Sequence, residues 1–137
     1  MGNSPVMNKL GAVFIHVTDM KRAIAWYSDL LGLPVRSSSH EGTIYDLEMD
    51  GGTGVILDSN HKGERSVNQK TQFFFETCDL QASYEWVTGK GIEIVTGIEV
   101  HENISFFTFR DPDGNVLMIC EDKRKLEKDD PERLVKK

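Results

Sequence analysis

The fold is decided by residues 11–34, GAVFIHVTDMKRAIAWYSDLLGLP. The stretch opens with an apolar run typical of a buried strand, and Asp19 follows it as a candidate helix N-cap. Apolar residues then recur at the spacing of one helix face: Met20, Ala23, Ile24, Tyr27 and Leu31. Gly32 and Pro34 end this pattern. The stretch therefore predicts a strand followed at once by a helix that packs back on it.

The same arrangement returns in the second half of the chain. The apolar run Phe73–Cys78 precedes Asp79, which is placed as Asp19 is, and Trp86 matches Trp26. A second helical pattern follows and is ended by glycines: Leu80, Ser83, Tyr84, Val87, Gly89 and Gly91. Because a strand–helix unit is repeated, the sequence indicates a duplicated architecture.

Short strand patterns follow each helix. In the first half they cover residues 43–49 and 55–57, separated by the glycine-rich turn 51–54. In the second half they cover residues 92–95, 105–109 and 116–120, with the turn 111–114 before the last. Each half therefore reads strand–helix–strand–strand–strand. Two such βαβββ modules side by side predict an α+β fold: one curved eight-stranded mixed sheet, helices outside, with a concave inner face that suits a ligand.

Composition narrows the class of protein. A chain of 137 residues is the usual size of one domain, and we expect polar or charged tails at residues 1–8 and 123–137. The net charge of −6 argues against binding to nucleic acid or anionic membranes, which need a basic face. No apolar run is long enough to span a membrane, and no secretion signal is evident. Two cysteines make no disulfide framework, so we expect a cytoplasmic location.

Two stretches carry a family resemblance: residues 17–33, VTDMKRAIAWYSDLLGL, and residues 109–115, FRDPDGN. Together they resemble the vicinal oxygen chelate superfamily, which includes glyoxalase I, extradiol dioxygenases, and fosfomycin and bleomycin resistance proteins. The resemblance implies a single glyoxalase-like domain over residues 9–122, with modules at about 9–62 and 70–122. It also implies a homodimer that binds a small molecule in the cupped sheet.

The resemblance also implies where a metal would be held. Enzymes of the superfamily bind a divalent ion through one ligand from each of four strands, and the corresponding residues here are Ala12, Leu57, Gln72 and Met118. Of these only Gln72 offers an oxygen that a hard cation accepts. A shift of one residue, from Leu57 to Asp58, would turn the side chain to the other face of the sheet. We therefore expect neither the family's metal nor another cofactor.

Candidate ligand-binding residues follow from the alternation of side chains along a strand. Every second residue of the first strand in each half is expected to face the ligand, and Met118 of the last strand is expected to face it too. The predicted ligand-binding residues are Phe14, His16, Gln72, Phe74, Glu76 and Met118. A histidine and a carboxylate that face one cleft suit proton transfer or hydrogen bonding to a polar ligand. The alternative is that both are satisfied polar groups at the rim. No residue is assigned a catalytic role.

Other reactive side chains have plainer interpretations. Arg110 could clamp an anion, although an ion pair with a neighbouring aspartate is favoured. His40, His61 and His101 are expected at the surface, and Cys120 as a small buried apolar residue. Trp26 and Trp86 are expected to pack on the sheet or at an interface.

Three functions remain open at this stage. The favoured one is binding of a small organic molecule without metal, and the acidic charge suits a cationic ligand. The second is a metal-dependent enzyme of the lactoylglutathione lyase or ring-cleaving dioxygenase type, with a displaced site built from His16, Glu76 and Gln72. The third is a ligand sensor or a partner-binding subunit that uses the charged C-terminal tail.

Overall fold

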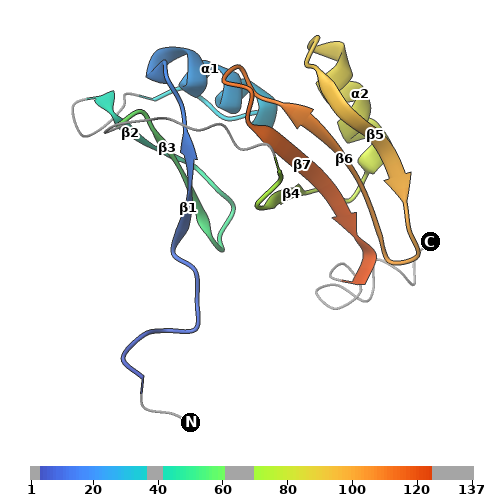
Figure 1. Cartoon of the computed structure of the whole chain (residues 1–137), viewed down its shortest axis with the longest axis horizontal. Coiled ribbons are helices and arrows are strands. Elements are labelled where there is room, and N and C mark those ends of the chain that lie inside the picture. The colour runs from blue at the N-terminus through green and yellow to red at the C-terminus, as the bar shows by residue number, and fades with distance from the viewer. Residues whose placement is uncertain (1–3, 37–41, 61–69, 125–137) are drawn as a thin grey trace. The chain divides into compact units, whose positions relative to one another are not determined.

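The computed structural model of the chain describes residues 4–36, 42–60 and 70–124 (Figure 1). The chain divides into two compact units, residues 1–65 and 66–137, called here the first and second unit. Each unit contains one copy of the predicted strand–helix repeat. No helix in the described ranges is long and apolar enough to cross a membrane.

The first unit consists of β1 (Ala12–His16), α1 (Met20–Leu31), β2 (Ile44–Leu47) and β3 (Gly54–Asp58). β3 is the central strand, with β1 parallel on one side and β2 antiparallel on the other. α1 packs on β2 and β3. The buried strand residues alternate with more exposed ones, which gives the sheet a helix-covered face carrying Ile15, Tyr45, Leu47, Val55 and Leu57.

The ends of α1 are those that the sequence predicts. The Asp19 side chain accepts a hydrogen bond from the backbone N–H of Arg22, 3.1 Å away, as an N-cap does. Gly32 ends the helix with φ = 70°, a conformation that glycine adopts without steric cost. The hairpin expected at residues 51–54 is also confirmed, since β2 and β3 pair antiparallel on either side of it.

The second unit has four strands and one helix: β4 (Phe74–Glu76), α2 (Leu80–Gly89), β5 (Ile94–Val100), β6 (Ile104–Arg110) and β7 (Val116–Asp122). The sheet order is β4-β7-β6-β5, with β4 parallel to β7 and the other pairs antiparallel (Figure 1). α2 packs on β6 and β7. Its Tyr84 ring meets the fully buried Phe107 edge-on, with the ring centroids 5.1 Å apart.

The α+β class is confirmed, but the single eight-stranded sheet is not, because the described residues form seven strands in two sheets. The strand predicted directly after each helix exists as β5 in the second unit. In the first unit the described residues 33–36 form no strand. Pro34 has no N–H to donate to a ladder, and the N–H of Arg36 bonds instead to the hydroxyl of Tyr45, at 3.2 Å.

The two tryptophans differ in their surroundings. Trp26 is half-buried and meets Tyr27 edge-on at a centroid distance of 4.7 Å, as a packing residue does. Trp86 on α2 is exposed, and the Nζ of Lys90 lies 4.0 Å from its ring centroid. Burial of Trp86 against the sheet is therefore not observed.

Candidate functional site

In the first unit, the sheet face opposite α1 carries two of the predicted ligand residues. Phe14 and His16 are exposed on β1, whereas Ile15 between them is buried. Phe14 pairs in register with Ile56 of β3, and His16 pairs with Asp58. Register partners share a face of the sheet, so an aromatic residue and a histidine–aspartate pair lie side by side there.

Asp58 corrects one expectation. The family resemblance places Leu57 toward the ligand and Asp58 away from it. The structure shows the reverse. Leu57 is fully buried on the helix-covered face, and Asp58 pairs in strand register with His16 on the opposite face. One oxygen of the Asp58 carboxylate accepts the N–H of Asn60, at 2.7 Å, which fixes its direction at the end of β3. An imidazole beside a carboxylate can bind a polar group or transfer a proton.

In the second unit, the face opposite α2 carries three further predicted residues. Phe74 of β4 pairs in register with Met118 of β7, and Glu76 pairs with Cys120. Phe74 and Glu76 are exposed. The prediction that these side chains share a face is therefore confirmed by the register. Gln72 is exposed but precedes β4, so its expected place on the strand is not observed.

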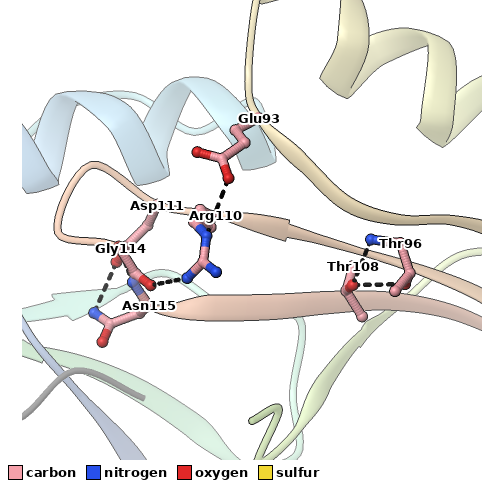
Figure 2. Close-up of polar contacts among 7 residues, drawn as sticks. All are labelled: Glu93, Thr96, Thr108, Arg110, Asp111, Gly114 and Asn115. Atoms are coloured by element: carbon pink, nitrogen blue, oxygen red, sulfur yellow. Dashed lines mark hydrogen bonds and ion pairs between the residues drawn. The ribbon is translucent and has the colours of Figure 1, made fainter. Parts of the chain in front are cut away.

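The same face continues onto β6, where sequence reasoning left the choice of residues open. Thr108 pairs with Met118, and Phe106 pairs with Cys120, so these are the β6 residues that face away from α2. Their neighbours Phe107 and Phe109 are fully buried in the core. Thr108 also bonds through its hydroxyl to that of Thr96 on β5, 2.7 Å away (Figure 2).

His101 is the residue of this face that sequence reasoning missed. Its side chain is exposed, as expected, but its ring stacks on that of Phe106, with centroids 5.7 Å apart and planes inclined by 17°. Its Nε2 lies 3.5 Å from a carboxylate oxygen of Glu99. The sequence places His101 in a short polar turn and gives no sign of a contact with Phe106. The contact arises only because β5 pairs with β6 and brings the turn back over Phe106.

Cys120 lies at the centre of this face and is almost completely buried, as predicted. Burial raises the pKa of its thiol, and the carboxylate of Asp122 raises the pKa further, with smaller contributions from Glu121 and Glu76. Arg124 acts in the opposite direction. Cys120 is therefore held as a neutral thiol, which is a poor nucleophile.

Arg110 has a structural role at the turn between β6 and β7. Its Nε forms an ion pair with Glu93 at 3.1 Å, and a terminal guanidinium nitrogen donates to the carbonyl of Gly114 at 2.9 Å (Figure 2). The ion pair is therefore with Glu93 and not with the neighbouring aspartate that the sequence favours. These contacts hold the guanidinium on the turn, which disfavours its use as an anion clamp.

The buried pair Asp111 and Asn115 organises that turn. The carboxylate of Asp111 accepts hydrogen bonds from the backbone N–H groups of Asp113 and Asn115, at 2.9 and 2.8 Å. It also accepts one from the side-chain amide of Asn115, at 3.0 Å (Figure 2). The motif at residues 111–115 that carries the family resemblance is thus a self-satisfied turn. His40 and His61 lie outside the described residues.

The residues at the family's metal positions do not fit a divalent ion. Ala12 has no donor atom, and Met118 offers a soft thioether. In register, the counterpart of Met118 in the first unit is Ile56, which is equally unsuited to a hard cation. Among the residues that the structure describes, no three His, Cys, Asp or Glu side chains gather closely enough to hold a metal.

Two units built of a strand, a helix and an antiparallel hairpin, each with a helix-free sheet face, define a duplicated α+β protein of the glyoxalase-like type. The profile of the Glyoxalase/Bleomycin resistance protein/Dioxygenase superfamily matches residues 9–119. The chain belongs to this superfamily, and the predicted resemblance is confirmed.

Individual relatives are distant. The protein YetH of Bacillus subtilis (strain 168), itself described as uncharacterized, is 22% identical over 120 residues, which span 85% of this chain and all of YetH. Lactoylglutathione lyase from Agrobacterium tumefaciens has a similar structure, with a TM-score of 0.66 and 18% identity over 85% of this chain and 95% of the lyase. TioX from Micromonospora sp. ML1 gives a TM-score of 0.65 at 18% identity, over 84% and 99% of the two chains. At these identities the solved structures establish the fold alone.

Proposed function

We propose that the protein binds a small organic molecule on the helix-free faces of its sheets, in the concave cleft that the family resemblance implies, and without a divalent metal. One observation carries the proposal. Phe14 and Phe74 occupy equivalent places in the two units, and their side chains remain 53% and 41% exposed although each lies in a strand. Exposed aromatic rings at matched positions are typical of a surface that is covered by a ligand.

The polar residues of the two faces suit orientation of such a ligand. His16 and Glu76 each lie two residues beyond the phenylalanine on the same strand, so each unit presents a ring and a polar group together. Ligand sites usually combine apolar contact area with a few such polar groups. The carboxylates of Asp58 and Glu76, with the net charge of −6, favour a cationic ligand.

The proposal is tested by a thermal-shift screen of small organic cations and neutral aromatics against the wild-type chain, with and without added divalent metal ions. We expect at least one compound to raise the melting temperature without metal. Phe14→Ala and Phe74→Ala should each remove most of that rise, since each deletes an exposed contact. Val35→Ala is the matched control, because Val35 is also exposed in the first unit, at 63%, but lies outside its strands. The ligand-induced shift of this variant should equal that of the wild type.

Metal analysis of the purified protein separates binding from the enzymatic alternative. Bound Zn, Ni, Mn or Fe in one-to-one ratio that disappears in His16→Ala or Glu76→Gln would establish a displaced metal site and overturn the metal-free proposal. A ligand-induced shift that is equal in both phenylalanine variants and in the wild type would show that these faces are not the binding surface.

We also propose that the protein is a homodimer, as the resemblance implies, and that it is cytoplasmic, as its cysteine content suggests. The free thiols of Cys78 and Cys120 are compatible with a reducing compartment. Light scattering coupled to size-exclusion chromatography should give twice the mass of the 15.5 kDa chain. A mass of one chain across the micromolar range would contradict the dimer.

A further inference from the structure

A row of four register partners crosses the helix-free face of the second unit. Glu76 of β4 pairs with Cys120 of β7, Cys120 pairs with Phe106 of β6, and Phe106 pairs with Glu99 of β5. Neighbouring strands lie about 4.8 Å apart. The ring of Phe106 therefore has a carboxylate one strand away on one side and another two strands away on the other.

The imidazole ring of His101 lies on this row. The imidazole of His101 lies nearly parallel to the ring of Phe106, inclined by 17°, and its Nε2 is 3.5 Å from Glu99. The backbone N–H of His101 donates to the carbonyl of Ile104 at 2.9 Å, which closes the turn that brings the imidazole back over the sheet. A planar nitrogen ring thus obtains a stacking partner and a carboxylate at the same place.

Carboxylates outweigh the cationic charge around the row. Burial raises the pKa of the Cys120 thiol, and after burial the carboxylates of Asp122, Glu121 and Glu76 raise the pKa, with Arg124 opposing them. Arg124 is itself ion-paired with Asp122, with its Nε 3.2 Å from the carboxylate. The field at the centre of the row is therefore negative and favours a cation over a neutral or anionic group.

We propose that the ring of Phe106 is a binding subsite for a planar, positively charged nitrogen heterocycle, and that the imidazole of His101 covers this subsite and moves aside when such a ligand stacks there. The inference rests on the proposed function and narrows the ligand to one chemical class. The ligand would replace His101 in two contacts, the stack on Phe106 and the approach to Glu99. Because its ring system is larger than an imidazole, it would also extend toward Glu76, beyond Cys120. His101 is then a specificity-determining residue, because a ligand binds only if it stacks on Phe106 more favourably than the imidazole of His101 does.

The test compares two fluorescent probes of similar size, 9-aminoacridine, which is a cation at neutral pH, and acridine, which is largely uncharged. We expect the wild-type chain to bind 9-aminoacridine more tightly than acridine. His101→Ala should tighten 9-aminoacridine by about three- to tenfold, because the competing stack is removed. Phe106→Leu should weaken it by about tenfold or more, the usual loss when an aromatic stacking partner is deleted.

Two further variants guard against general effects on folding. Glu99→Gln should weaken 9-aminoacridine by about two- to threefold and leave acridine unchanged, since only the charge differs. Val100→Ala is the control on the same hairpin. Val100 is exposed, and its register partner is Ser105, so it belongs to the other face of the sheet. The Val100→Ala variant should bind both probes with the affinity of the wild type.

Each alternative outcome overturns the subsite. Weaker or unchanged binding in His101→Ala, unchanged binding in Phe106→Leu, or equal affinity for the two probes in the wild type would contradict it. So would the absence of binding by wild type and His101→Ala alike at millimolar probe. The proposed function fails separately: a ligand that depends on Phe14 and Phe74 but not on Phe106 would support that function and exclude this subsite.

Discussion

The two helices begin in the same way but contribute unequally to the core of their units. Both start at an aspartate N-cap that directly follows a strand. α1 buries five of its 12 residues, whereas α2 buries only Leu80 and Val87 of its ten. The second unit has a fourth strand, and β6 and β7 supply most of its core. A repeated sequence pattern therefore fixes where a helix begins without fixing how much of the core it provides.

The largest expected effect is at Tyr27 of α1, which is fully buried. Tyr27→Ala should lower the free energy of unfolding by about 3–5 kcal/mol, the cost of deleting a buried aromatic ring. Val87 is the fully buried residue at the same place in α2, and Val87→Ala should cost about 2 kcal/mol because fewer atoms are removed. Urea titration followed by circular dichroism measures both.

Tyr27→Phe is the milder variant to use if Tyr27→Ala fails to fold, and it should retain most of the stability because the ring remains. Equal losses in Tyr27→Ala and Val87→Ala would show that α2 contributes as much to stability as α1. The comparison of the two helices would then be wrong.

The two hairpin turns differ as the helices do. In the second unit the Asp111 carboxylate accepts three hydrogen bonds and is almost fully buried. Asp111→Ala leaves those donors unpaired and should cost about 2–3 kcal/mol. Asp50 directly precedes the turn at residues 51–54 and is exposed, so Asp50→Ala should change stability by less than about 0.5 kcal/mol. A loss below about 1 kcal/mol for Asp111→Ala would mean that the turn tolerates its removal.

Local signals in the sequence predicted most of the fold. The caps Asp19 and Asp79, the helix-ending Gly32 and the turns at residues 51–54 and 111–114 all depend on nearest neighbours along the chain. Each is found where it was expected. No eighth strand lies among residues 4–36, 42–60 and 70–124. The repeat predicted it from symmetry, although Pro34 in the first unit has no counterpart at the matching place in the second.

Site residues depended on register, which the sequence does not determine. Alternation along β1 and β4 predicts that Phe14, His16, Phe74 and Glu76 lie on the sheet faces opposite the helices, and the register agrees with that placement. Asp58 was assigned to the wrong face, because a one-residue error in aligning the two hairpins reverses every side chain. His101 was missed because its contact with Phe106 exists only after β5 and β6 pair.

The helix N-caps provide a more sensitive comparison. Asp19 accepts from Arg22 and Asp79 accepts from Ala82, at 3.1 and 3.0 Å. α2 has an additional anchor, because the N–H of Leu80 donates to the Glu121 carboxylate at 3.1 Å.

We therefore expect Asp19→Ala to cost about 1 kcal/mol and Asp79→Ala about half as much, while Glu121→Ala, which removes the acceptor of the Leu80 N–H, restores the larger loss when combined with Asp79→Ala. Denaturant titration of the four proteins, wild type included, resolves the difference. If the two single variants lose the same amount, Glu121 does not anchor the start of α2.

The smallest expected effect has the opposite sign. Ser28 of α1 is 1% exposed, and its Oγ has no hydrogen-bond partner among the described residues. Thr88 has the same position relative to the N-cap of α2, but it is exposed and its Oγ1 donates to the carbonyl of Tyr84 at 2.9 Å. Ser28→Ala removes an unpaired buried hydroxyl and should raise the free energy of unfolding by about 0.5–1 kcal/mol.

Thr88→Ala should change stability by less than about 0.5 kcal/mol, since it removes only exposed hydrogen bonds of the hydroxyl, to the carbonyls of Tyr84 and Glu85, while alanine favours the helix. Thermal unfolding of both variants beside the wild type measures the difference. A loss of stability in Ser28→Ala would reveal a partner for the Ser28 hydroxyl in solution, and the packing of α1 on its sheet would then include a buried polar contact.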